Sequence, residues 1–215
     1  MSQSKAIKFI NDNGTLLVFP IVNKKEPKSL WSCMHPRTPM RWDWNDDGDD
    51  RVMKMWFMMK KLSQNSDVVY SKWYQGRATF FSHKVFTAML RVLQENPLNL
   101  RPQQQAARDI FECLESDSPL STKELKKMTG LQGKSFEGEY NRGLKELFQK
   151  LLIVGFGEVD DGAFPSLAVG ATRLIHEPLW LASQELSLED ANRTLSKFWP
   201  KNSLYRKHFS KQTVN

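Results

Sequence analysis

The spacing of hydrophobic residues predicts that the chain begins with a helix over 4–13 and a short strand over 15–19. Apolar side chains recur every three or four residues in the first stretch, and the second is β-branched and aromatic. Prolines interrupt 23–50, which we expect to be an ordered loop. Three tryptophans in this loop would pack on the core, because their apolar area is too large to leave in water. They are Trp31, Trp42 and Trp44.

The same pattern then predicts a helix, a β-hairpin and another helix. Apolar residues return at helical spacing after residue 50, and their positions are Val52, Met55, Trp56, Met59 and Leu62. Alternating residues over 67–73 and 77–81 predict two antiparallel strands. Ser82 is a suitable N-cap for the following helix, which ends near Asn96.

The second half of the chain has the pattern of a winged helix. In order, it predicts a helix over 102–115, a short helix after 121, a longer helix over 136–152, and strands over 153–159 and 163–172. Ser121 and Glu124 have the spacing of a capping box at the start of the short helix. Three helices followed by a hairpin are typical of this variant of the helix-turn-helix, whose wing tip would be 160–162.

We therefore expect an α+β fold that is mainly helical, with tandem winged-helix-like units and short β-hairpins. Residues 1–96 would form the N-terminal unit of helix, hairpin and helix, and 97–183 the winged-helix domain. Residues 184–215 would form a C-terminal helix and a basic tail that is mobile after Pro200.

Composition indicates a soluble cytoplasmic protein. The 215 residues contain two cysteines, too few for a disulfide framework or a cysteine-rich zinc site. The longest apolar run, 16–22, is too short to cross a bilayer, and the first residues lack the apolar region of a secretory signal.

The charge distribution favours a polyanionic partner. The formal net charge is +7, and no acidic side chain follows Asp190. The cations beyond that point are Arg193, Lys197, Lys201, Arg206, Lys207 and Lys211. Nucleic acid would release counterions on binding such a surface, whereas the alternative is a solvated lysine face that keeps the protein soluble.

Local motifs give no support for a metal or a cofactor. The run 43–49 matches the first half of a calcium loop, but Lys54 stands where a bidentate glutamate must close the coordination sphere. We expect an acidic turn there that favours the start of the next helix. The four histidines have no zinc-binding spacing, and the glycines of 155–157 fit a wing or bulge better than a phosphate loop.

The longer helix of the second half is the candidate recognition element. In and before it lie donors of the kind that contact phosphates and base edges, namely Lys134, Ser135, Asn141, Arg142 and Lys145. Glu137 and Glu139 would act against DNA binding, so a protein-contact module is the alternative. On the first hairpin, we expect Arg77 and Lys72 opposite it to hold a phosphate.

Three stretches resemble the AlkZ-related proteins of the winged-helix superfamily of bacterial DNA glycosylases, the AlkZ and YcaQ type that unhooks interstrand crosslinks. They are 29–31, 72–82 with its Gly-Arg-Ala-Thr-Phe-Phe-Ser segment, and 155–167. The resemblance covers most of 6–183. It implies tandem winged helices, double-stranded DNA as ligand, and cleavage of the bond between an alkylated purine and its sugar.

The chain departs from these glycosylases in length and in the catalytic signature. They are longer, and they position a water with a Gln, an apolar residue, and a Gln or Asp. The corresponding spacing here is 103–105, which has a polar middle residue and opens a helix, so no catalytic residue is transferred.

Three functions therefore stay open: a DNA-binding protein without this chemistry, a glycosylase, and a protein-interaction module. A glycosylase would need a carboxylate or amide in a pocket between the two halves and an aromatic wedge to hold the DNA open. Candidates for the wedge are Trp42, Trp44, Trp73 and Tyr74.

Overall fold

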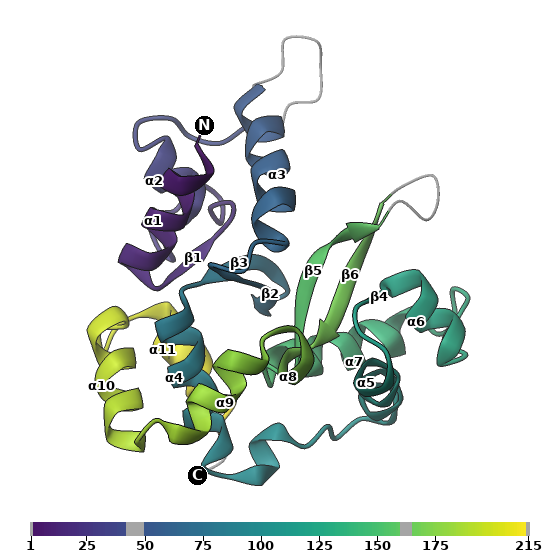
Figure 1. The fold of residues 1–215 in the computed structure, drawn as a ribbon. Coiled ribbons are helices and arrows are strands. Elements are labelled where there is room, and N and C mark those ends of the chain that lie inside the picture. The colour runs from purple at the N-terminus through teal and green to yellow at the C-terminus, as the bar shows by residue number, and fades with distance from the viewer. Residues whose placement is uncertain (1, 42–49, 160–164, 214–215) are drawn as a thin grey trace.

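The computed structural model describes residues 2–41, 50–159 and 165–213. These residues form an α+β fold that is mainly helical, with two three-stranded antiparallel sheets, as the sequence predicts (Figure 1). None of the described helices is long and apolar enough to cross a membrane.

The elements from α1 to β3 form what we call the first unit. They are α1 (Gln3–Asn13), β1 (Thr15–Leu17), α2 (Leu30–Met34), α3 (Asp50–Ser63), β2 (Val69–Tyr74) and β3 (Arg77–Phe81). The strands lie in the order β1-β3-β2. Gly14, with a φ of 72°, makes the tight turn from α1 into β1. Ser29 caps α2 by accepting a hydrogen bond from the Ser32 N–H, so part of the predicted loop 23–50 is helical.

The elements from α5 to β6 form the second unit, and they repeat this order. They are α5 (Gln105–Ser116), β4 (Leu120–Ser121), α6 (Thr122–Met128), α7 (Glu137–Gln149), β5 (Ile153–Val159) and β6 (Ser166–Ala171). The strands lie in the order β4-β6-β5, equivalent to that of the first unit. The hairpin register shifts between Ser71 and Tyr74 in the first unit, and between Gly155 and Glu158 in the second. Gly157, with a φ of 80°, lies in this second irregularity, which confirms the predicted bulge.

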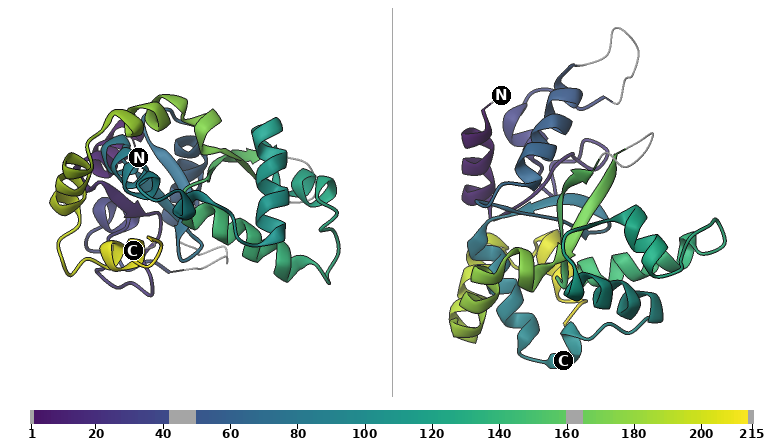
Figure 2. Two further views of the ribbon diagram at one scale, coloured as in Figure 1. Left: turned by 90° about the horizontal axis from the view of Figure 1, so that it is seen from below. Right: turned by 45° about the vertical axis from the view of Figure 1, so that its right-hand side comes forward.

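The remaining helices belong to neither unit. They are α4 (His83–Gln94), the 3-10 helix η1 (Pro97–Leu100), α8 (Thr172–Ile175), α9 (Glu177–Glu185), α10 (Leu188–Phe198) and α11 (Leu204–Phe209). Most lie beside the first unit, whereas α8 packs on β5 and β6 of the second. Helix α4 packs against α9 and α10, while the helices of the second unit project to the other side (Figure 2). The hydrophobic pattern does not predict α9, where Pro178 lies at the first turn and the apolar residues form no clear stripe.

The two units contact each other reciprocally. Strands β2 and β5 lie against each other, α3 of the first unit packs on β5, and α7 of the second unit packs on β2. A Cβ on Gly155 would lie 2.5 Å from the Tyr70 ring, so glycine is what allows this close approach. The third helix of each unit is therefore partly covered by the other unit.

The C-terminal segment is part of the core, which corrects the prediction of a mobile tail after Pro200. Tyr205 and Phe209 of α11 are buried beside Trp73 and Trp199, whose indole rings stack with centroids 5.8 Å apart. The Trp73 Nε1–H donates a hydrogen bond to Gln212 (2.7 Å). This buried cluster combines residues from all three predicted segments, 1–96, 97–183 and 184–215.

Candidate nucleic-acid interface

The start of α6 is fixed by the capping box that the sequence predicts. Ser121 Oγ accepts a hydrogen bond from the Glu124 N–H (3.1 Å), and the Glu124 carboxylate accepts one from the Ser121 N–H (2.9 Å). The turn that follows uses Gly130 and Gly133, whose φ values of 69° and 93° lie in the left-handed region. These glycines let the chain turn sharply from α6 into α7.

Helix α7 is held by one buried face. Tyr140 is buried, and its hydroxyl donates a hydrogen bond to the Thr122 carbonyl (2.9 Å). Gly143 lies against α5, where an added Cβ would be 3.0 Å from the Ala107 backbone nitrogen. This packing determines which side of α7 faces solvent.

The structure brings the predicted contact residues of the second unit together. Lys134 and Ser135 lie in the turn before α7, and Asn141, Arg142 and Lys145 lie on the helix. All five residues are exposed. The described residues provide no ion pair to the three cations among them, Lys134, Arg142 and Lys145.

Two of the three carboxylates of α7 are engaged inside the second unit. Glu137 pairs with Lys126 (2.7 Å), and hydrogen bonds from Lys126 and then Asn141 lower the pKa of its carboxyl group. Glu146 accepts hydrogen bonds of 2.5 and 3.1 Å from the backbone N–H groups of residues 103 and 104 at the start of α5. These interactions compensate charge that would otherwise repel a phosphate.

A second group of cations lies around the contact between Tyr74 and His208, whose rings are 4.8 Å apart. Burial lowers the pKa of His208, and the positive charges of Lys211 and Lys145 lower it further. Burial raises the pKa of Tyr74, and the charge of Arg77 acts in the opposite direction. Cations from β3, α7 and the C-terminal segment therefore gather around these two rings.

Lys72 does not belong to the group of cations around Tyr74 and His208. The residue paired with Arg77 across the hairpin is Tyr74, so the expectation that Lys72 lies opposite Arg77 is wrong. The register of Ser71 with Thr79 would place Trp73 opposite Arg77, and the bulge in β2 moves this position to Tyr74, so Lys72 is opposite Arg77 in neither register. Burial lowers the pKa of the half-buried Lys72, whereas the charge of Glu158 in β5 raises it. Lys72 therefore faces the junction of the two units.

The described residues that the sequence suggested for base release are either buried in the core or exposed at the start of a helix. Trp73 and Tyr74 are buried, with 0% and 4% of their surface exposed, so neither projects as a wedge. The glutamines at 103–105 are exposed at the start of α5, and Gln105 Nε2 donates to Asp109 (2.6 Å).

Some predicted features lie outside the described residues. These are Trp42, Trp44, the acidic run up to Asp49 and the wing tip 160–162. Over the part of the chain that is described, no three His, Cys, Asp or Glu side chains are grouped as metal ligands.

Comparison with known families decides where this chain belongs. The sequence model of the family described as AlkZ related matches residues 1–201. The chain belongs to the AlkZ-related family. Searches of curated proteins and of solved structures find no match. The match to the AlkZ-related family ends before α11, although Tyr205 and Phe209 of that helix complete the core.

Sequence reasoning missed the contribution of the C-terminal segment to the cationic surface. The excess of basic residues after Asp190 is visible in the sequence, but the packing of α11 decides that Lys211 and Lys145 both act on His208. It also missed Glu158, for which the sequence offers no signal beyond a carboxylate in a predicted strand.

Proposed function

We propose that this AlkZ-related protein binds double-stranded DNA through tandem winged helices in the cytoplasm, without the glycosidic chemistry of the longer glycosylases. The domain limits would be 1–96 and 97–183, with 184–215 packed against both. The repeated element order and the equivalent strand orders of the two units support the winged-helix interpretation. Membership of the AlkZ-related family supports a role connected with DNA repair.

One observation carries the proposal: the solvent-facing side of α7 presents Arg142 and Lys145, while Glu137 and Glu146 are engaged within the unit. Phosphates would contact these two cations and Lys134, and Ser135 and Asn141 would add hydrogen bonds. Because part of α7 is covered by β2, DNA would be held mainly by the first turns of the helix and the preceding turn. Arg77 and Lys211 would extend the same surface across the first unit.

Titration of a fluorescein-labelled duplex at several salt concentrations tests the proposal. The double variant Arg142→Ala/Lys145→Ala should weaken binding for any sequence. It should also reduce the slope of log K against log salt by about one to two, roughly one for each phosphate that is no longer neutralised. The matched control is Lys84→Ala/Lys197→Ala, which removes two cations from α4 and α10. Its smaller effect would show that position matters as well as charge.

An unchanged salt slope in the α7 variant would remove this helix from the interface. If the unmodified protein shows no binding even at low salt, DNA binding itself is contradicted. The protein-interaction module would then be the better explanation of the exposed face of α7.

A second candidate function is the release of alkylated bases, and one observation favours it. Glu158 lies at the junction of the two units with its side chain 16% exposed, 3.0 Å from Lys60 Nζ. A carboxylate held in such a place can stabilise the positive charge that develops on a sugar as its base leaves. Incubation with a duplex that contains an alkylated purine tests it, because Glu158→Gln should abolish release of the base and leave duplex binding intact.

A further inference from the structure

The first unit contains an insertion that the second unit lacks. In the second unit Ser121 ends β4 and also caps α6, so strand and helix are joined directly. In the first unit the chain passes through residues 18–28 between β1 and Ser29, the equivalent cap of α2. We call residues 18–28 the insertion loop.

The insertion loop is held in place by specific hydrogen bonds. The Asn23 side chain donates to the Met40 carbonyl (2.9 Å) and accepts from the Met40 N–H (2.7 Å). The Tyr205 hydroxyl of α11 donates to the Lys28 carbonyl (3.0 Å). Val22 has a φ of 49°, which is costly for a β-branched residue, so the surrounding interactions must maintain this conformation.

This loop and the segment after α2 enclose a hollow of about 470 Å³. Its floor includes the buried Trp31. The cations along its walls come from both sides: Lys24, Lys25 and Lys28 from the insertion loop, and Arg37 from the segment after α2. Of the described residues that line it, none carries a carboxylate.

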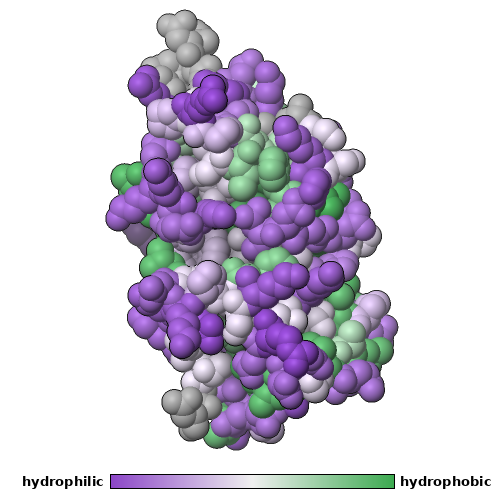
Figure 3. Space-filling model, turned by 90° about the vertical axis from the view of Figure 1, so that its left-hand side faces the viewer, coloured by the Kyte–Doolittle hydropathy of each residue, from purple (hydrophilic) through white to green (hydrophobic). Residues whose placement is uncertain are grey.

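A neighbouring hollow shows that this charge imbalance is not general on the surface. Between α1 and α10, on the side of the molecule turned toward the viewer in Figure 3, a hollow of about 650 Å³ is also lined by two lysines, Lys84 and Lys197. It is lined as well by Asp12 and Asp67, so the charges there compensate each other. That surface is mainly hydrophilic, with small hydrophobic patches (Figure 3).

We propose that the hollow beside the insertion loop binds a phosphate group. Four cations and no carboxylate line the hollow among the described residues, although Lys28 also lines an adjoining hollow with Asp12 and Glu26. The resulting positive potential attracts an anion, and the fixed loop lowers the entropy cost of assembling the cations. The hydroxyls of Ser32 and Thr38 also line the hollow and are suited to bind phosphate oxygens. The volume is in the range of small-ligand sites, so the phosphate belongs either to a free phosphorylated molecule or to a DNA backbone.

Calorimetric titration with inorganic pyrophosphate tests this site without any base or sugar. We compare the unmodified protein with Lys24→Ala/Arg37→Ala, which removes one cation from each wall, and with the control Lys84→Ala/Lys197→Ala. The first variant should weaken pyrophosphate binding about tenfold, and the control should change it less than twofold. None of these side chains is buried, so thermal unfolding should show that both variants fold.

The same variants are then titrated with duplex DNA. Weaker pyrophosphate binding with unchanged DNA binding identifies a site for a free phosphorylated molecule. A lower salt slope for DNA in Lys24→Ala/Arg37→Ala identifies a backbone contact. If this variant binds pyrophosphate and DNA like the unmodified protein, or if the unmodified protein binds neither, the proposal is overturned. The α7 variant Arg142→Ala/Lys145→Ala is measured in parallel, so failure of this site is distinguished from failure of the DNA interface.

Discussion

Lys60 of α3 forms an ion pair with Glu158 of β5, with Nζ and Oε2 3.0 Å apart. The two residues belong to different units, and their side chains are only 29% and 16% exposed. Lys72 of β2 is close enough for its pKa to be affected by the same carboxylate. The junction of the two units therefore contains a partly buried cluster of charges whose members depend on one another.

Removal of Lys60 should destabilise the protein more than removal of an ordinary surface lysine. Lys60→Met leaves the Glu158 carboxylate less well compensated in a partly buried position, which we expect to cost about 1–3 kcal/mol of unfolding free energy. Glu158→Gln in the same chain should recover part of this loss. Urea denaturation of the single and double variants measures the coupling. Additive effects of the two substitutions would contradict this coupling. The control is Lys54→Met, at an exposed ion pair with Asp50, which should change the free energy of unfolding by less than about 0.5 kcal/mol.

The C-terminal helix should contribute strongly to stability. Phe209 is 5% exposed and packs on Trp73 and Trp199, so Phe209→Ala should cost about 3 kcal/mol, because apolar packing is removed and a cavity is left behind. Tryptophan fluorescence during urea unfolding measures this change. Lys207→Ala, on the exposed side of the same helix, is the control, and an equal effect of both variants would show that Phe209 is not part of the core.

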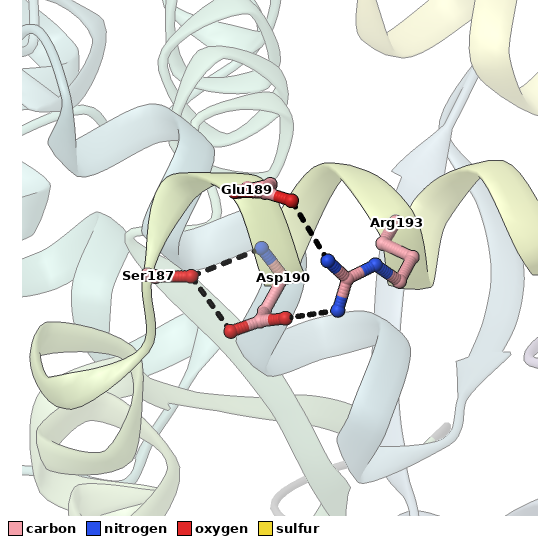
Figure 4. A network of polar contacts seen from close by, with 4 residues as sticks. All are labelled: Ser187, Glu189, Asp190 and Arg193. Atoms are coloured by element: carbon pink, nitrogen blue, oxygen red, sulfur yellow. Dashed lines mark hydrogen bonds and ion pairs between the residues drawn. The ribbon is translucent and has the colours of Figure 1, made fainter.

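Glu139 should limit the affinity for DNA. It is the one carboxylate of α7 for which the described residues supply no ion pair or hydrogen bond. Glu139→Gln should therefore strengthen duplex binding about two- to threefold at low salt, by removal of a like charge near the phosphates. Glu189→Gln is the control, because Glu189 belongs to a network with Arg193 on α10 (Figure 4). Unchanged or weaker binding by Glu139→Gln would argue against contact of α7 with DNA.

Stability should fall as the solution is acidified below neutral pH. Burial, with a smaller contribution from the charge of His83, lowers the pKa of His176 from 6.5 to about 4. The unfolded chain binds this proton more readily, so the stabilisation is complete above about pH 6.5 and is lost as the pH falls toward 4. The shift corresponds to roughly 3 kcal/mol.

His176→Gln removes this titration. Burial of His208 lowers its pKa as well, so part of the acid sensitivity should remain in the variant. The unmodified protein and His176→Gln are therefore compared by urea denaturation at pH 7 and at pH 4.5. Equal decreases of stability in both would show that His176 is not the group responsible.

Local features of the chain were largely readable from its sequence. The Ser121–Glu124 capping box depends on interactions between residues close in sequence, so their spacing predicts it. The glycines of β5 indicate a bulge by their residue type, although the neighbours that require glycine there, Tyr70 and Gln64, are far away in the sequence. Helices α2 and α11 were not predicted, because helices of five and six residues are too short to show a periodic pattern of apolar residues. Their apolar residues are stabilised by packing against distant elements.

The sequence by itself determined the fold class, the family, the order of elements in the second unit and the types of residue on its third helix. Tertiary structure alone decided which charged residues from distant parts of the chain lie close to one another. Packing turned Lys72 toward Glu158, while the hairpin register left Arg77 beside Tyr74. The position of α11 placed His208 within the influence of both Lys145 of α7 and Lys211. The physical reason is that burial and charge interactions depend on distance in space, and the packing of the two units sets those distances for residues far apart in the chain.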